Sequence, residues 1–162
     1  MSGTFPTTNF TTLNWNSNVT VRETTSITGR VQRSKTGGQY WSFVLQSPPL
    51  DRADFMSIYS FIVSQNGSFE SFTVVPPVVA STTGTMTGTV TLTNNAGSTV
   101  AVGGSTVKVR STDTGTLKKG DIIKFSNHDK VYMLTSDTTF DGSSTLDLDI
   151  FPPLVNAVSD TH

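Results

Sequence analysis

A single helix-shaped passage, residues 51–65, lies between two long stretches rich in Thr, Val, Gly and Ser. Asp51 suits the N-cap of a helix, and a glycine follows at the other end. Apolar residues recur inside the passage at i, i+3, i+4, i+7 and i+8, which makes one apolar stripe. Because burial stabilises such side chains, we expect the helix to pack on a sheet and the stripe to join a core. The stripe consists of Phe55, Ile58, Tyr59, Ile62 and Val63.

The stretches on both sides of the helix show the alternation of β-strands. Trp41, Phe43 and Leu45 fall on one side of a strand, which predicts that Trp41 and Phe43 are core residues. The adjacent glycines of residues 35–39 predict a hairpin turn. Short apolar runs at 122–125, 131–135 and 146–150 are typical of a small barrel.

The predicted fold class is mainly β. It is a β-sandwich or barrel with one amphipathic helix, about 51–65, packed on a sheet and followed by a second small β-barrel-like module. The expected segments are an N-terminal arm (1–18), a hairpin, helix and strand half (19–79), a barrel-like half (80–155) and a C-terminal tail (156–162). The two halves could also form one integrated domain.

The predicted arm is polar, with isolated apolar side chains that include Phe5, Phe10 and Trp15. Such an arm either packs loosely or orders on a neighbouring subunit. Trp15 is flanked by asparagines, and an exposed tryptophan is typical of an interface anchor. We therefore expect Trp15, Phe10, Phe5 and also Tyr40 to be interface residues.

Composition excludes several classes of function. The 11 basic and 12 acidic residues leave a net charge of -1, so no strong field attracts nucleic acid or an anionic membrane. The absence of cysteine excludes disulfides, thiolate metal sites and a cysteine nucleophile. The N-terminus lacks a signal-peptide pattern and no apolar run reaches about 18 residues, so we expect synthesis in a cytoplasm and no membrane insertion.

The residues give no catalytic constellation. His128 lies in a predicted turn and His162 is the last residue, which disfavours a Ser-His-acid triad. Asp141 precedes a glycine, but the ligand spacing of an EF-hand is missing. Asp147 and Asp149 share one strand face, where a solvated face is a better explanation than a metal site. We predict no catalytic residues, no cofactor and no metal.

Three passages resemble a family of small tail proteins of tailed bacteriophages. They are GQYWSF (38–43) leading to PPLDRADF (48–55), QNGSFESF (65–72), and LKKGD (117–121) through FPPL (151–154). The resemblance implies a non-enzymatic, distal-tail-like structural subunit of the virion, assembled in the host bacterial cytoplasm. It also implies a homo-oligomeric ring at the tail tip or baseplate that links the tail tube to the host-recognition apparatus, with other phage tail proteins as partners.

Three alternatives stay open at this point. The chain could belong to the neck or the tail tube of the same particle. It could be a carbohydrate-binding or adhesion module that uses Trp15 or Tyr40 as a stacking platform. It could be a glycosidase, which would need two carboxylates about 5 to 10 Å apart in a cleft.

Overall fold

The computed structural model describes residues 3–6, 10–93 and 99–159. Parts of the expected arm and tail therefore lie outside the described residues. The chain divides into two compact units, Met1–Val78 and Val79–His162. The described residues are mainly β-structure with one α-helix, which confirms the predicted fold class.

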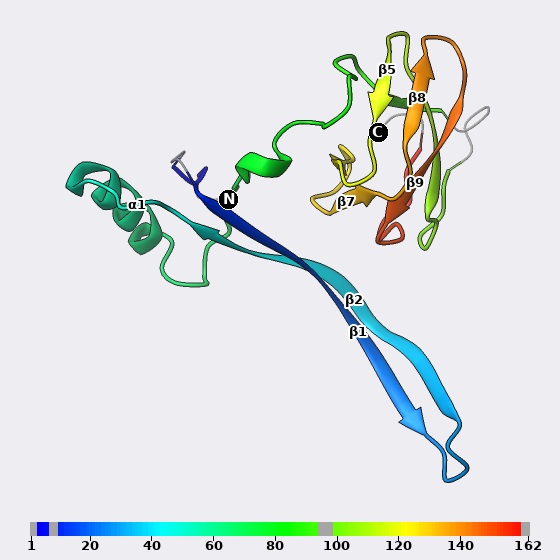
Figure 1. Cartoon of the computed structure of the whole chain (residues 1–162), viewed down its shortest axis with the longest axis horizontal. Helices are drawn as coiled ribbons and strands as arrows, with labels where there is room; N and C mark the ends of the chain where they lie inside the picture. Colours follow the sequence, from blue (N-terminus) through cyan, green and yellow to red (C-terminus); the bar gives the residue numbers. More distant parts are fainter. Residues whose placement is uncertain (1–2, 7–9, 94–98, 160–162) are drawn as a thin grey trace. The chain divides into compact units, whose positions relative to one another are not determined.

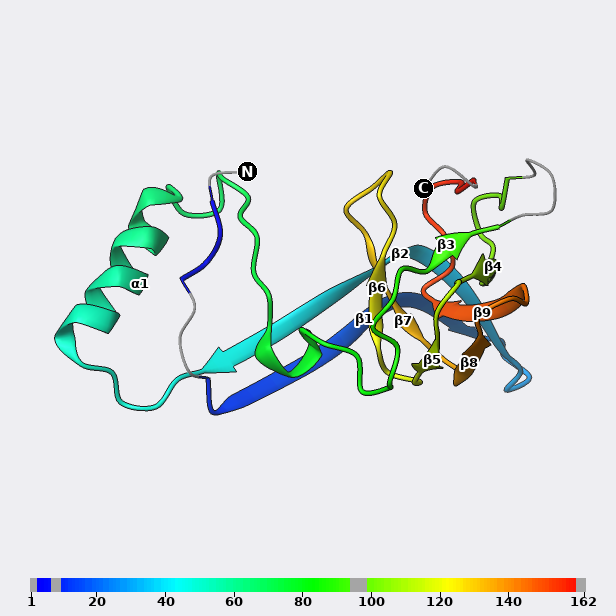
Figure 2. The same ribbon diagram turned by 90° about the horizontal axis from the view of Figure 1, so that it is seen from above.

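The first unit contains a two-stranded antiparallel ribbon. Its strands, β1 (Thr12–Thr25) and β2 (Val31–Gln46), run side by side (Figures 1 and 2). Trp15 of β1 lies directly opposite Phe43 of β2. β1 begins at Thr12, inside the 1–18 segment that was expected to be an arm. Residues 12–18 pair with β2 although their sequence does not alternate clearly between apolar and polar residues.

The hairpin turn lies between Ser26 and Arg30, and the prediction of a turn at residues 35–39 is wrong. The N–H of Ser26 donates to the carbonyl of Arg30 at 2.9 Å, and Gly29 takes a positive φ of 78°. Residues 35–39 stay within β2, where the register shifts opposite Thr20. At this shift β2 has more residues than β1, which is an irregularity of the β-bulge type. Adjacent glycines suit such a bulge as well as they suit a turn.

The predicted helix is confirmed as α1 (Arg52–Ser64). Asp51 is its N-cap, and the carboxylate accepts a hydrogen bond from the N–H of Asp54 at 2.9 Å. At the other end, Asn66 and Gly67 have φ values of 53° and 72°. This left-handed backbone ends the helix, as the sequence indicated.

The structure does not show the expected packing of α1 on a sheet. All residues of α1 belong to the described part of the chain, and none of them is buried. Phe55, Tyr59, Ile62 and Val63 are exposed, and Ile58 is half-buried. Periodicity indicates that a stripe needs a cover, but it does not indicate that the cover comes from the same chain.

Four phenylalanines hold α1 to the rest of the first unit. Phe61 of α1 makes edge contacts with Phe5 and Phe72, with ring centroids 5.7 and 5.4 Å apart. Phe10 lies beside Phe5 at 6.2 Å. The N–H of Phe5 donates to the carbonyl of Thr73 at 2.8 Å, which ties the N-terminal segment to the chain after the helix. We call Phe5, Phe10, Phe61 and Phe72 the phenylalanine cluster.

The second unit is an antiparallel β-module. Its strands are β3 (Thr91–Leu92), β4 (Thr106–Arg110), β5 (Thr114–Leu117), β6 (Ile122–Lys124), β7 (Val131–Leu134), β8 (Thr138–Asp141) and β9 (Leu146–Phe151). A short 3-10 turn, η1 (Pro77–Val79), precedes them. A five-stranded sheet in the order β3-β4-β9-β7-β6 curls into a half-barrel, and β5 and β8 form a separate pair (Figure 1).

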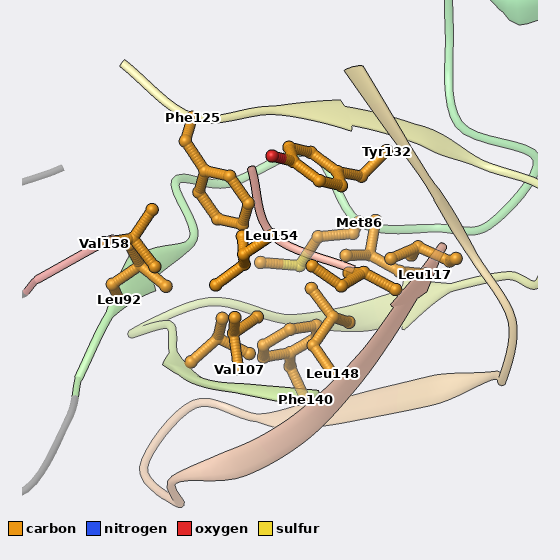
Figure 3. Packing of buried hydrophobic residues seen from close by; sticks show 13 residues of the cluster. Met86, Leu92, Val107, Leu117, Phe125, Tyr132, Phe140, Leu148, Leu154 and Val158 are labelled. Atoms are coloured by element: carbon orange, nitrogen blue, oxygen red, sulfur yellow. The ribbon is translucent and has the colours of Figure 1, made fainter. Parts of the chain in front are cut away.

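The buried hydrophobic cluster among the described residues lies in the second unit. Figure 3 shows side chains from several strands meeting in one layer. Alternate residues of β4 and β9 point into it, as the alternation of buried and exposed positions in β4 shows. The cluster consists of Met86, Leu92, Val107, Val109, Leu117, Phe125, Tyr132, Leu134, Phe140, Leu148, Ile150, Leu154 and Val158.

Candidate assembly surfaces

The acidic side chains that the sequence singled out are engaged in the fold. Asp147 forms an ion pair with Lys108 at 2.9 Å, across the β4–β9 ladder. Asp149 accepts hydrogen bonds from the hydroxyls of Thr106 and Ser136. Within the described residues, no group of three or more His, Cys, Asp or Glu side chains is arranged to hold a metal ion.

Asp141 closes a tight turn after β8. Its carboxylate accepts hydrogen bonds from the N–H groups of Ser143 and Ser144, at 2.9 and 2.7 Å. The Ser144 hydroxyl and N–H, followed by the N–H of Ser143, lower the pKa of this carboxyl well below its usual value. This is an Asx-type turn rather than a calcium loop.

Asp121 is the buried carboxylate that the sequence did not single out. It accepts hydrogen bonds from the N–H groups of Thr83 and Lys118, at 2.8 and 2.9 Å, and from the hydroxyls of Thr82 and Thr83. Burial raises the pKa of Asp121, but these hydrogen bonds outweigh it and lower the pKa below the usual value. The carboxylate fastens the segment before the barrel to the start of β6. Because Thr82 lies 39 residues away in sequence, no local pattern could have revealed this contact.

His128 also has a structural role. Its Nε2 lies 2.7 Å from the hydroxyl of Tyr132, which in turn accepts a hydrogen bond from the N–H of Val155 at 3.2 Å. Tyr132 is fully buried, and burial raises the pKa of its phenol. The pair satisfies the polar tip of a core side chain, which is a common requirement for a buried tyrosine.

The second unit also contains a hollow of about 380 Å³. Apolar side chains such as Val90, Ile123 and Phe125 line most of it, and Lys124 stands among its few polar neighbours. Lys124 is already paired with Asp129 at 2.7 Å. The lining includes neither Trp15 nor Tyr40, which are the residues of the carbohydrate hypothesis.

The predicted interface residues occupy three different environments. Trp15 is half-buried in the ribbon: its ring stacks on Phe43 with centroids 5.6 Å apart and planes 9° apart. Phe5 and Phe10 are half-buried in the phenylalanine cluster. Tyr40 lies on the opposite face of the ribbon and is 60% exposed. The structure therefore does not bring these four residues together on one free arm.

The first unit presents two apolar surfaces. The helix stripe combines side chains of α1 that are each about half exposed, between 47% and 57%. It consists of Phe55, Tyr59, Ile62 and Val63 from the predicted stripe together with Met56, whereas Ile58 of the predicted stripe is half-buried. The ribbon face combines alternate side chains of β1 and β2, in which the rings of Trp15 and Trp41 lie 5.5 Å apart with their planes tilted by 42°. It consists of Leu13, Trp15, Val19, Trp41, Phe43 and Leu45.

These features define a β-rich protein in which the acidic side chains described above hold strands and turns together and in which the first unit carries exposed apolar side chains. Residues 79–162 match the family model described as the B domain of the distal tail protein pb9. The chain belongs to this family of phage tail proteins. A comparison with curated proteins gives no match. In the described part of the chain, no helix has the length and apolar character needed to cross a membrane.

Proposed function

We propose that the chain is a non-enzymatic structural subunit of a phage tail, which forms part of a homo-oligomeric ring at the tail tip or baseplate. In this role it links the tail tube to the host-recognition apparatus, contacts other tail proteins, and is assembled in the host cytoplasm before it enters the virion. The observation that carries the proposal is the family match of residues 79–162 to a distal tail protein domain.

The surface of the first unit supports assembly. The helix stripe and the ribbon face differ in shape, since one is a ridge of side chains on a helix and the other is a face of two paired strands. Contacts between unlike surfaces on identical chains are heterologous, and they generate rings when the rotation closes. Repeated around a ring, individually modest contacts add up.

The acidic residues support a structural role over a glycosidase. Asp121 is occupied by four donors, and Asp147 by an ion pair with Lys108. A general acid or nucleophile must instead meet substrate in a cleft. In this fold these carboxylates hold strands and turns together.

Quantitative mass spectrometry of purified particles tests the proposal. Peptides of this chain should be present at a constant ratio to the tail-tube protein, in several copies per tail. Purified particles that lack its peptides would overturn the proposal. A phage with the gene deleted should produce particles without functional tails, and a plasmid copy should restore them.

A further inference from the structure

The segment after β9, residues 152–159, contributes to the core of the second unit. Leu154 and Val158 of this segment belong to the buried cluster and are 2% and 0% exposed (Figure 3). The N–H of Leu154 donates to the carbonyl of Gly104 at 2.8 Å, and the N–H and C=O of Val158 pair with those of Val100. These contacts join residues of the second unit only. We call residues 152–159 the C-terminal strap.

A network of side-chain hydrogen bonds connects the C-terminal strap to His128. The N–H of Val155 donates to the hydroxyl of Tyr132 at 3.2 Å, and that oxygen lies 2.7 Å from Nε2 of His128. On the other side of the ring, Nδ1 of His128 contacts Oδ1 of Asn127. Nδ2 of Asn127 donates to the carbonyl of Ala157 at 2.8 Å. The network therefore begins and ends on the strap and passes through His128.

The direction of these hydrogen bonds assigns the proton of the imidazole. Because the hydroxyl of Tyr132 already accepts from a backbone N–H, its own hydrogen is available for Nε2 of His128. Nε2 is then the acceptor, and the proton of the neutral ring lies on Nδ1. Asn127 agrees with this assignment, since its Nδ2 donates to the strap and its Oδ1, an acceptor, faces Nδ1. Every donor of the network has an acceptor while His128 is neutral.

Protonation of His128 conflicts with this network. An imidazolium carries N–H groups on both nitrogens, so Nε2 changes from an acceptor to a donor. The hydroxyl hydrogen of Tyr132 then loses its acceptor, and Tyr132 is fully buried. An unpaired buried donor destabilises the closed arrangement, whereas release of the strap lets water solvate both groups. Because the released state binds the proton more readily, release becomes more favourable as the pH falls.

The charged side chains near His128 come from its own part of the chain. The carboxylate of Asp129 interacts with the ring electrostatically and favours the protonated form. The same carboxylate pairs with Lys124 at 2.7 Å, which offsets that attraction. Lys130 follows two residues after His128, and Tyr132 is the titratable group in contact with Nε2. The C-terminal strap contains no charged residue, so its response to pH depends on the hydrogen bonds of the ring.

We propose that His128 is a pH-sensitive switch for the C-terminal strap. Neutral His128 completes the hydrogen-bond network and holds the strap on the core, and protonation of His128 favours its release. Histidine ordinarily titrates near about pH 6.5, so the change falls in a mildly acidic range. Release is local, because the ladders that join β9 to β4 and to β7 do not include the strap. The switch lies in the second unit and does not depend on the proposed ring.

Hydrogen exchange of the full chain, followed by mass spectrometry and corrected for the intrinsic effect of pH, tests the switch. Peptides that cover residues 152–159 should lose protection by about tenfold between pH 8 and pH 5, which corresponds to the lower range for an unpaired buried donor. Peptides of β4 and β9 should change far less. Equal protection of the strap at both pH values would overturn the inference.

Substitutions separate His128 from other titrating groups. His128→Gln places an amide that does not titrate at this position, so the protection of the strap should become the same at pH 8 and pH 5. Tyr132→Phe removes the hydroxyl and should lower the protection at both pH values. His162→Gln is the matched control, because it removes the other histidine and should leave the full response to pH. A response that persists in His128→Gln would assign the pH dependence to another group.

Nuclear magnetic resonance of chain with ¹⁵N-labelled histidine gives a readout that needs no substitution. At pH 8 the ring of His128 should be neutral and should carry its proton on Nδ1, as the network requires. A proton on Nε2 at pH 8 would contradict the direction of the hydrogen bonds. Protonation of the ring with unchanged protection of the strap would also contradict the switch. Neither result bears on the content of purified particles, which decides the proposed function independently.

Discussion

Replacing Asp121 by asparagine should destabilise the second unit strongly. The carboxylate accepts hydrogen bonds from two N–H groups and two hydroxyls, contributed by Thr82, Thr83 and Lys118. Asparagine keeps one acceptor oxygen and turns an NH₂ group toward donors. Losing two hydrogen bonds to a charged group, at roughly 1.5 kcal/mol or more each, predicts a loss of about 3 kcal/mol. For a domain of this size, that lowers Tm by about 12 to 24 °C.

The same carboxylate should make stability depend on pH in a defined direction. The folded-state pKa of Asp121 is lowered, because its hydrogen bonds outweigh the effect of burial. Its contribution is therefore fully present above the unfolded pKa of about 3.9 and is lost as pH falls through the folded pKa. The stability difference between the unsubstituted chain and the Asp121→Asn variant should shrink between pH 6 and pH 3.

Urea unfolding of the full chain at several pH values measures both effects. Asp113→Asn is the matched control, because Asp113 is exposed and its carboxylate accepts no hydrogen bond from a described residue. That variant should stay within about 0.5 kcal/mol of the unsubstituted chain. A loss below 1 kcal/mol for Asp121→Asn, or a loss that is the same at pH 6 and pH 3, would refute this reasoning.

Two further substitutions test the backbone and the helix cap. Gly84→Ala places a Cβ 1.9 Å from the carbonyl oxygen of Thr116, so thermal unfolding should reveal a loss of about 3 kcal/mol. Gly38→Ala, where nothing lies within 4 Å, is the control, and equal losses would contradict the prediction. Asp51→Ala removes the acceptor for the N–H of Asp54 and should cost about 1 kcal/mol of helix stability by circular dichroism. Asp51→Ser should restore most of the lost helix stability. An Asp51→Ala variant with unchanged helix stability would contradict the capping role of Asp51.

Local signals in the sequence predicted the elements that local interactions determine. Asp51 and Gly67 delimit α1 because capping and left-handed backbone depend on neighbouring residues. The strands β6, β7 and β9 follow from short apolar runs between turn residues. The position of the hairpin turn was wrong, because paired glycines suit a bulge as well as a turn, and the choice depends on the pairing of the whole ribbon.

Contacts between residues far apart in the sequence could not be predicted from local patterns. The hydrogen bonds of Asp121 join residues almost forty positions apart, and the phenylalanine cluster joins Phe5 to Phe61. The helix stripe shows a different limit: its periodicity correctly predicts an apolar surface, but Tyr59 and Ile62 are about half exposed and are not buried under a sheet. A pattern of apolar residues measures the need for burial and does not identify the partner.

Immunogold electron microscopy of purified phage, with an antibody against this chain, locates the subunit in the particle. We expect gold at the distal end of the tail, on particles that also contain peptides of the chain. Gold at the head–tail junction would contradict the tail-tip assignment and move the subunit to the neck. Unlabelled particles without its peptides would contradict the structural role itself.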